Sequence, residues 1–176
     1  MKRLYILRHA KAVPAEPSAD DSARGLAARG HADAARLGVW LAENDMQPAF
    51  VLCSPARRTV ETWQDVSQAF AKLSEALFPS VLYLASPNLI FAELRKAPAK
   101  PESLMVIGHN PGLESLALHL VKRPKSDKAK DRVRAMAEGF PTCALGIFEF
   151  DIEKWKELAF GEGELTHFIR PKDLKG

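Results

Sequence analysis

Three short segments of the chain each join an apolar run to residues that can bind or transfer a phosphoryl group. They are residues 7–10 (Leu-Arg-His-Ala), 53–58 (Cys-Ser-Pro-Ala-Arg-Arg) and 107–111 (Ile-Gly-His-Asn-Pro). An imidazole can act as a nucleophile, and the planar guanidinium of arginine can bind two phosphate oxygens at once. These residue types together predict a site for an anionic, phosphoryl-bearing ligand.

The elements before and after these segments would bring them together. Apolar runs at 3–7, 50–53 and 104–107 predict buried strands, and ligands of open α/β sheets bind beyond the carboxyl ends of strands. The second and third segments also open predicted helices, whose N-termini favour anions. A single histidine at a strand end is more often structural. Two such histidines, with Arg8 adjacent to His9, favour a functional role and a structural role equally when only residue types are considered.

Composition limits the class of protein. The chain has 176 residues, of which 47% are hydrophobic and 27% charged, so we expect one soluble domain over residues 1–176. The apolar runs are too short for a membrane span or a signal peptide, which predicts a cytoplasmic location. A net charge of +3 does not indicate a nucleic-acid-binding protein. Cys53 and Cys143 are expected to be reduced and buried.

Apolar runs that alternate with helical patterns predict an α/β fold. After a loop at 10–24, we expect a helix over 25–44. A second helix, with Ser54 as N-cap and Pro55 at its first position, is predicted to continue through Leu77. A strand at 81–84, a short helix over 88–97 and a helix capped by Asn110 follow. Residues 143–150 and 164–169 predict two strands, the last at a sheet edge.

The strongly basic segment 122–132 has two interpretations. It is either a patch for an acidic partner or a solvated loop, and we favour the loop. The helical spacing of Trp40 and Trp63 predicts core packing rather than a ligand-stacking surface.

The order and spacing of the motifs resemble the histidine phosphatase superfamily, the phosphoglycerate-mutase-like group. Arg8-His9 after an N-terminal strand is similar to the first motif, residues 54–58 with Thr62 to the second, and residues 108–112 to the third. The short length and the segments 24–26, 29–30 and 166–174 resemble the small SixA-type branch of phosphohistidine phosphatases. The resemblance covers nearly the whole chain. It implies a three-layer α/β/α fold with a mostly parallel central sheet.

The resemblance also implies roles for individual residues. His9 matches the nucleophile that becomes phosphorylated, and the remaining phosphate-pocket residues match Arg8, Arg58 and His109. Arg24 matches an arginine that the small branch places near the phosphate. Arg58 is preferred to Arg57 because Thr62 lies four positions later, so Arg57 is expected to face solvent. Two further residues are expected to contact substrate: Ser54 and Asn110.

These roles define a mechanism without a cofactor. Attack requires an unprotonated nitrogen on His9, and the nearby arginines are expected to lower its pKa. Water then attacks phospho-His9 and releases phosphate. A zinc site at His9 and His109 is the alternative, but no third histidine or cysteine follows at ligand spacing, so no metal is predicted.

The chain has no clear equivalent of the acidic residue with which larger members of the superfamily protonate the leaving oxygen. Glu93 is expected on a solvated helix face, and three other acids on helix surfaces: Glu61, Glu75 and Glu114. Asp20 and Asp21 could reach the site from the first loop. A missing acid handicaps an alkyl ester more than a phosphoramidate, whose leaving imidazole water can protonate.

The missing acid therefore favours phosphohistidine on a protein as the substrate. Two alternatives stay open: a phosphomonoesterase of the same family that acts on a small phosphorylated substrate, and a catalytically idle domain that binds phosphate or a phosphoprotein. The oligomeric state is not predicted.

Overall fold

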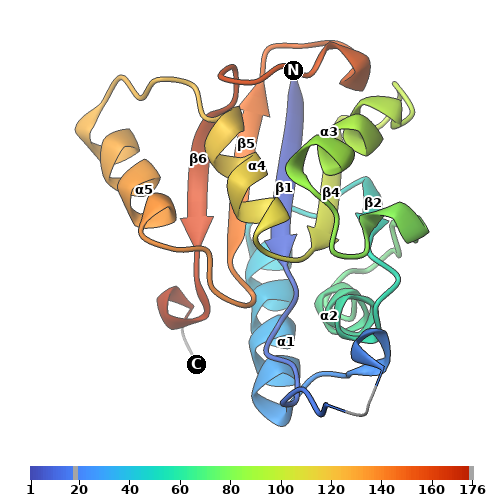
Figure 1. Ribbon diagram of the computed structural model, residues 1–176. Coiled ribbons are helices and arrows are strands. Elements are labelled where there is room, and N and C mark those ends of the chain that lie inside the picture. Colours follow the sequence, from blue (N-terminus) through green and yellow to red (C-terminus); the bar gives the residue numbers. More distant parts are fainter. Residues whose placement is uncertain (18–19, 175–176) are drawn as a thin grey trace.

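The computed structural model describes residues 1–17 and 20–174, and six strands in this part form one sheet (Figure 1). The strands are β1 (Lys2–Arg8), β2 (Phe50–Cys53), β3 (Glu75–Leu77), β4 (Ser103–Gly108), β5 (Leu145–Phe150) and β6 (Glu164–Ile169). Their order in the sheet is β3-β2-β4-β1-β5-β6. The first four strands are mutually parallel, and β5 runs antiparallel to both of its neighbours. The predicted, mostly parallel sheet is confirmed.

Helices cover both faces of this sheet. They are α1 (Ala28–Glu43), α2 (Arg57–Ser67), α3 (Pro87–Lys96), α4 (Gly112–Leu120) and α5 (Asp127–Ala137). Side chains of α1 and α2 share one apolar cluster with the sheet, whereas those of α3, α4 and α5 share the other. In β1, Leu4 and Ile6 belong to the second of these clusters, and Tyr5 and Leu7 to the first. Successive side chains of β1 thus pack alternately against the two helix layers. The three-layer α/β/α fold is confirmed.

Several of the predicted elements lie where the sequence placed them. The helices predicted over 25–44 and 88–97 are α1 and α3, and the last strand, β6, does lie at a sheet edge. Trp40 and Trp63 pack against the core, and Cys53 and Cys143 are buried free thiols. No helix of the described residues is long and apolar enough to cross a membrane.

The helix predicted to run through Leu77 ends ten residues earlier, at Ser67. The later apolar residues do not continue a buried face, since Leu73 is 68% exposed and Leu77 lies in β3. Tertiary hydrogen bonds hold this segment extended: the Ser74 hydroxyl donates to the Pro48 carbonyl, and Gln47 donates to the Lys72 carbonyl. Helical spacing alone could not reveal these partners.

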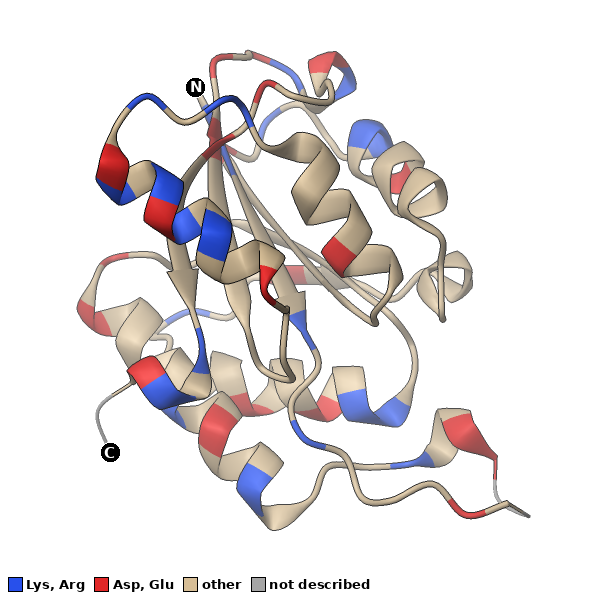
Figure 2. Cartoon of the chain, turned by 60° about the vertical axis from the view of Figure 1, so that its left-hand side comes forward, with Lys and Arg blue, Asp and Glu red and all other residues tan. Residues whose placement is uncertain are grey.

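Two further predictions are wrong. Residues 81–84 do not form a strand, because β3 already occupies that edge and Ser80–Leu82 form a 3₁₀ helix. The segment 122–132 is not simply a loop, since α5 begins at Asp127. The Ser126 hydroxyl accepts a hydrogen bond from the Ala129 N–H, which caps this helix. Figure 2 shows that α5 carries both signs of charge rather than a uniformly basic face.

Candidate active site

The three predicted segments meet because their strands are neighbours in the sheet. β4 lies between β1 and β2, with Arg8 opposite Gly108 and Cys53 opposite Ile107. The His9 N–H donates to the Gly108 carbonyl at 3.1 Å, and the Ser54 N–H donates to the Ile107 carbonyl at 2.9 Å. The ring centroids of His9 and His109 are consequently only 5.3 Å apart.

His9 is held in one tautomer. Its Nδ1 lies 2.8 Å from the Ala10 carbonyl, which can only accept, so Nδ1 carries the proton of the neutral ring. Burial lowers the pKa of His9 to about 4, and the positive charges of three arginines act in the same direction: Arg58, Arg8 and Arg24. The predicted direction is confirmed, although burial is a larger cause than the arginines. At neutral pH, Nε2 therefore keeps a free lone pair.

Thr62 fixes the turn that presents His9. Its hydroxyl accepts from the Ala10 N–H at 2.9 Å and donates to the Arg58 carbonyl at 2.6 Å. The threonine is fully buried and ties the end of β1 to the first turn of α2. The spacing between Arg58 and Thr62 thus has a structural reason in this chain: one helical turn separates the buried arginine beside His109 from the residue that anchors the His9 loop.

His109 is engaged through both ring nitrogens. Its Nδ1 lies 3.3 Å from an Arg58 amino group, which can only donate, so the ring proton is on Nε2 and points to the Ser54 hydroxyl at 2.7 Å. Burial is the largest cause that lowers the pKa of His109 to about 3, followed by the charges of Arg58 and His9. Ser54 thus accepts the Nε2 proton of His109. The prediction that Ser54 caps a helix is wrong, because α2 begins at Arg57 and Ala56 occupies its N-cap position.

Burial distinguishes Arg58, the predicted site residue, from its neighbour Arg57. Arg58 is 2% exposed and lies within hydrogen-bond distance of His109, whereas the Arg57 side chain is 65% exposed and pairs with Glu61. Arg57 faces solvent, as predicted.

Asp21 and Tyr83 complete this cluster. The sequence indicated that Asp20 or Asp21 could reach the site, and Asp21 does so, whereas Tyr83 was not among the predicted site residues. The Asp21 carboxylate accepts from Arg58 at 2.9 Å, from Tyr83 Oη at 2.7 Å and from Arg24 at 2.9 Å. Arg58 also donates to the Asp21 carbonyl at 2.7 Å. The hydrogen bond from Tyr83 is the largest cause that lowers the pKa of Asp21, to about 2, followed by Arg58. Asp21 is therefore an anion that anchors two arginines.

Asn110 and Glu114 position the other side of the site. The Asn110 amide donates to the Phe140 carbonyl at 2.9 Å and to Glu114 at 3.3 Å, and Arg8 donates to the same Phe140 carbonyl at 2.9 Å. Asn110 does not cap α4, which begins at Gly112 after Pro111, so that prediction is wrong. Glu114 also accepts from the Phe140 N–H, so it is not simply a solvated surface acid.

Several buried polar atoms at this site, three donors and one acceptor, have no hydrogen-bond partner within the described residues. The buried Nε atoms of Arg8, Arg24 and Arg58, and the buried Oδ1 of Asn110, make no hydrogen bond there. Arg36 on α1 has the same feature, so one such atom does not define a site. Three guanidiniums with free N–H groups around one imidazole do suit an anion with several oxygens.

The predicted carboxylates do not supply an obvious proton donor. Glu93 lies on α3, where it pairs with Lys96 at 2.6 Å. Glu61 accepts from the Leu26 N–H and from Arg57, and Glu75 lies in β3 rather than on a helix. Within residues 1–17 and 20–174, no group of three or more histidine, cysteine or acidic side chains could hold a metal ion.

Comparisons with known proteins agree with this geometry. A family model described as the histidine phosphatase superfamily (branch 1) matches residues 4–76. An uncharacterized protein of Mycobacterium tuberculosis is 30% identical over 167 residues, which cover 94% of this chain and 100% of the relative.

Two solved structures extend the similarity over the whole fold. One, from Agrobacterium tumefaciens and provisionally assigned as the phosphohistidine phosphatase SixA, is 27% identical with a TM-score of 0.79, covering 97% of this chain and 98% of its own. A second, from Nakamurella multipartitia with the same provisional assignment, is 27% identical with a TM-score of 0.80. The match covers 97% of this chain and 96% of the other. The predicted phosphoglycerate-mutase-like fold is confirmed.

Proposed function

Because the chain belongs to the histidine phosphatase superfamily, we propose that it is a phosphatase that works through a phosphorylated His9 and acts on phosphohistidine in proteins. The observation that carries the proposal is the state of His9, a buried neutral imidazole whose Nδ1 proton is held by the Ala10 carbonyl. This arrangement leaves Nε2 unprotonated among three arginines.

The first step forms a bond between His9 Nε2 and phosphorus and breaks the bond between phosphorus and the leaving group. A leaving imidazole takes its proton from water. In the second step a water oxygen bonds to phosphorus, the P–N bond of phospho-His9 breaks, and the water proton passes to solvent. His9 returns to the neutral tautomer in which Nδ1 donates to Ala10.

The cations at the site act on the charge of the transferring group. Arg8, Arg24 and Arg58 each have a buried Nε–H available for an equatorial phosphoryl oxygen. Asp21 holds Arg24 and Arg58 in place through ion pairs at 2.9 Å, so these guanidiniums need not reorganise when charge develops. Ser54 and Asn110 act through their neighbours in this proposal: Ser54 orients His109, and Asn110 fixes the Phe140 carbonyl beside Arg8.

The preference for phosphohistidine rests on the lack of a suitable acid. Asp21 is the carboxylate bound to the site arginines, and its pKa of about 2 makes it a poor proton donor at neutral pH. An alkoxide leaving group needs a donor, whereas an imidazole leaving group is protonated by water. The provisional assignment of both structural relatives as phosphohistidine phosphatases agrees with this preference.

The test compares three substrates in wild type and His9→Ala: a phosphohistidine peptide, an aryl phosphate and an alkyl phosphate. We expect wild type to hydrolyse the phosphohistidine peptide with the highest kcat/KM and His9→Ala to hydrolyse none of them. Equal or better turnover of the alkyl ester would point to the phosphomonoesterase alternative. If wild type hydrolysed none of the three substrates but still bound vanadate, the protein would be a catalytically idle domain that binds phosphate or a phosphoprotein.

A further inference from the structure

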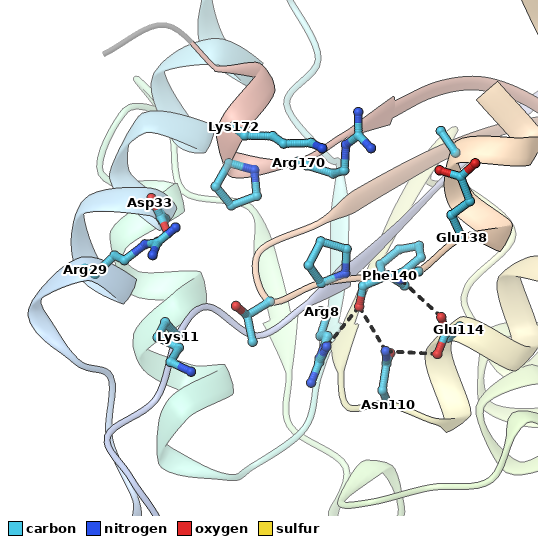
Figure 3. A pocket seen from close by; sticks show the side chains of 15 residues that line it. Arg8, Lys11, Arg29, Asp33, Asn110, Glu114, Glu138, Phe140, Arg170 and Lys172 are labelled. Atoms are coloured by element: carbon cyan, nitrogen blue, oxygen red, sulfur yellow. Dashed lines mark hydrogen bonds and ion pairs between the residues drawn. The ribbon is translucent and has the colours of Figure 1, made fainter. Parts of the chain in front are cut away.

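A groove of about 770 Å³ runs beside the candidate active site. Its walls come from the end of β1 and the loop after it, the first two turns of α1, the start of α4, the end of α5 with the segment that joins it to β5, and the residues that follow β6. Figure 3 shows Arg8 and Asn110 among the side chains that line it, both directed to Phe140. Arg8 directly precedes His9 in sequence, and Asn110 directly follows His109. We call this cavity the basic groove.

Positive charge dominates the basic groove. Five basic side chains line it, against three acidic ones: Arg8, Lys11, Arg29, Arg170 and Lys172 against Asp33, Glu114 and Glu138. Asp33 is only 5% exposed and pairs with Arg29 and Arg36, and Glu114 is occupied by Asn110 and the Phe140 N–H. The pairing of Asp33 also occupies Arg29, so the cations left for a ligand are those of the five that have no acidic partner.

Two lysines are the cations most available to a ligand. In the described part of the chain, neither Lys11 nor Lys172 has an acidic partner within 4.0 Å, and both are exposed. Figure 3 places them with Arg29 on one side of the groove, away from Glu114 and Glu138. Arg170, by contrast, is held by Asp173 at 2.8 Å.

The backbone that carries Lys11 is fixed. The Ala27 N–H donates to the Lys11 carbonyl at 2.9 Å, and α1 approaches so closely at Gly30 that a Cβ there would lie 2.1 Å from that carbonyl. Lys11 follows His9 by two residues, so its place relative to the nucleophile is set by this packing. The basic groove therefore has a defined position next to the phosphoryl site.

We propose that the basic groove binds an acidic segment of the protein substrate, with aspartate or glutamate side chains near the phosphohistidine paired to Lys11 and Lys172. The groove is larger than one phosphate needs, and its free cations are spread over separate elements, which suits an extended chain with several carboxylates. This inference rests on the proposed function, since it names the kind of protein sequence that the site selects.

The test uses two phosphohistidine peptides that differ only in having glutamate or glutamine around the phosphohistidine. Turnover by wild type is measured first. Binding is then measured by fluorescence polarization in the His9→Ala background, where the proposed mechanism allows no turnover. The Lys11→Gln, Lys172→Gln double variant is compared with Lys72→Gln, an exposed lysine beside β3 at the opposite sheet edge.

We expect the acidic peptide to bind roughly threefold to tenfold more tightly than the neutral one at low salt, because each exposed charge pair contributes modestly. The double variant should lose most of this preference and still hydrolyse the neutral peptide and an aryl phosphate. Lys72→Gln should keep the preference, and added salt should reduce it in wild type.

Equal binding of the two peptides would overturn the proposal for the groove, as would a preference that survives in the double variant. Failure of the proposed function looks different. In that case wild type hydrolyses neither peptide, whatever the binding measurements show.

Discussion

The buried centre around Arg58 and the basic groove beside it both collect positive charge, but they hold it differently. Arg58 is 2% exposed and is fixed by Asp21 and His109. In the groove, the Arg29 side chain is 81% exposed and pairs with Asp33 only at 3.6 Å. A buried, fixed cation stabilises developing charge strongly, whereas an exposed one contributes little and is screened by salt. We therefore expect the centre to control rate and the groove to control the choice of substrate.

The strongest test of this division compares two adjacent arginines. Arg58→Ala should lower kcat/KM for an aryl phosphate by roughly 10²–10³-fold, because it removes a buried donor from the transferring phosphoryl group. Arg57→Ala changes an exposed side chain and should stay within about twofold. Thermal unfolding of both variants checks that the fold is retained. Similar losses in the two variants would mean that burial does not separate the functions of the two arginines.

The second prediction concerns protonation of the buried histidines. The folded pKa values of His9 and His109, about 4 and about 3, lie below the ordinary value of about 6.5. As pH falls below about 6.5, the unfolded chain therefore binds protons that the folded chain does not, and stability is lost down to the folded pKa values. Linkage predicts a loss of about 2 kcal/mol per histidine between pH 7 and pH 5.

Two measurements check this pH dependence. In NMR titrations, the ring signals of His9 and His109 should stay constant from pH 8 to about pH 5.5 and should titrate normally in the urea-unfolded chain. Urea unfolding at pH 7 and pH 5 should show a smaller loss of stability in His109→Gln than in wild type. Ring signals that titrate near 6.5 in the folded chain would contradict the neutral, buried histidine pair.

A smaller effect is expected at Thr62, which joins the His9 loop to α2. Thr62→Val keeps the shape but leaves the buried Ala10 N–H without its acceptor, which should lower the free energy of unfolding by about 1–3 kcal/mol. Thr166→Val is the matched control, because Thr166 is only half-buried and its two contacts are long: its hydroxyl lies 3.2 Å from the Ile147 carbonyl and 3.2 Å from His167 Nδ1. Urea denaturation measures both variants, and equal losses would remove Thr62 from its anchoring role.

The smallest effect should be that of salt on the centre itself. Raising sodium chloride from about 0.05 to about 0.3 M shortens the Debye length but hardly affects a buried charge. The inhibition constant of vanadate should therefore change by less than about threefold. A much larger change would show that solvent screens the centre as it does the groove.

The α/β fold and the meeting of the segments that carry His9, Arg58 and His109 could be predicted from strand-sized apolar runs that end at or a few residues before these side chains. The three-layer architecture was predicted from the family resemblance. Asp21 could not be chosen over Asp20 in this way, since its position depends on Tyr83, 62 residues away. Tyr83 itself was hidden in a segment predicted as a strand. The start of α5 was recoverable, because Ser126 followed by Asp127 is an ordinary helix-start signal that the basic character of the segment obscured.

The most direct measurement of the central claim is to trap the phosphorylated enzyme. Wild type is mixed with a ³²P-labelled phosphohistidine peptide, quenched within milliseconds under alkaline conditions and digested, and the labelled fragment is identified. Phosphorylation through a histidine predicts one acid-labile, alkali-stable label on His9, absent from His9→Ala and retained in Arg57→Ala. A label on another residue, or full turnover by His9→Ala, would contradict the account.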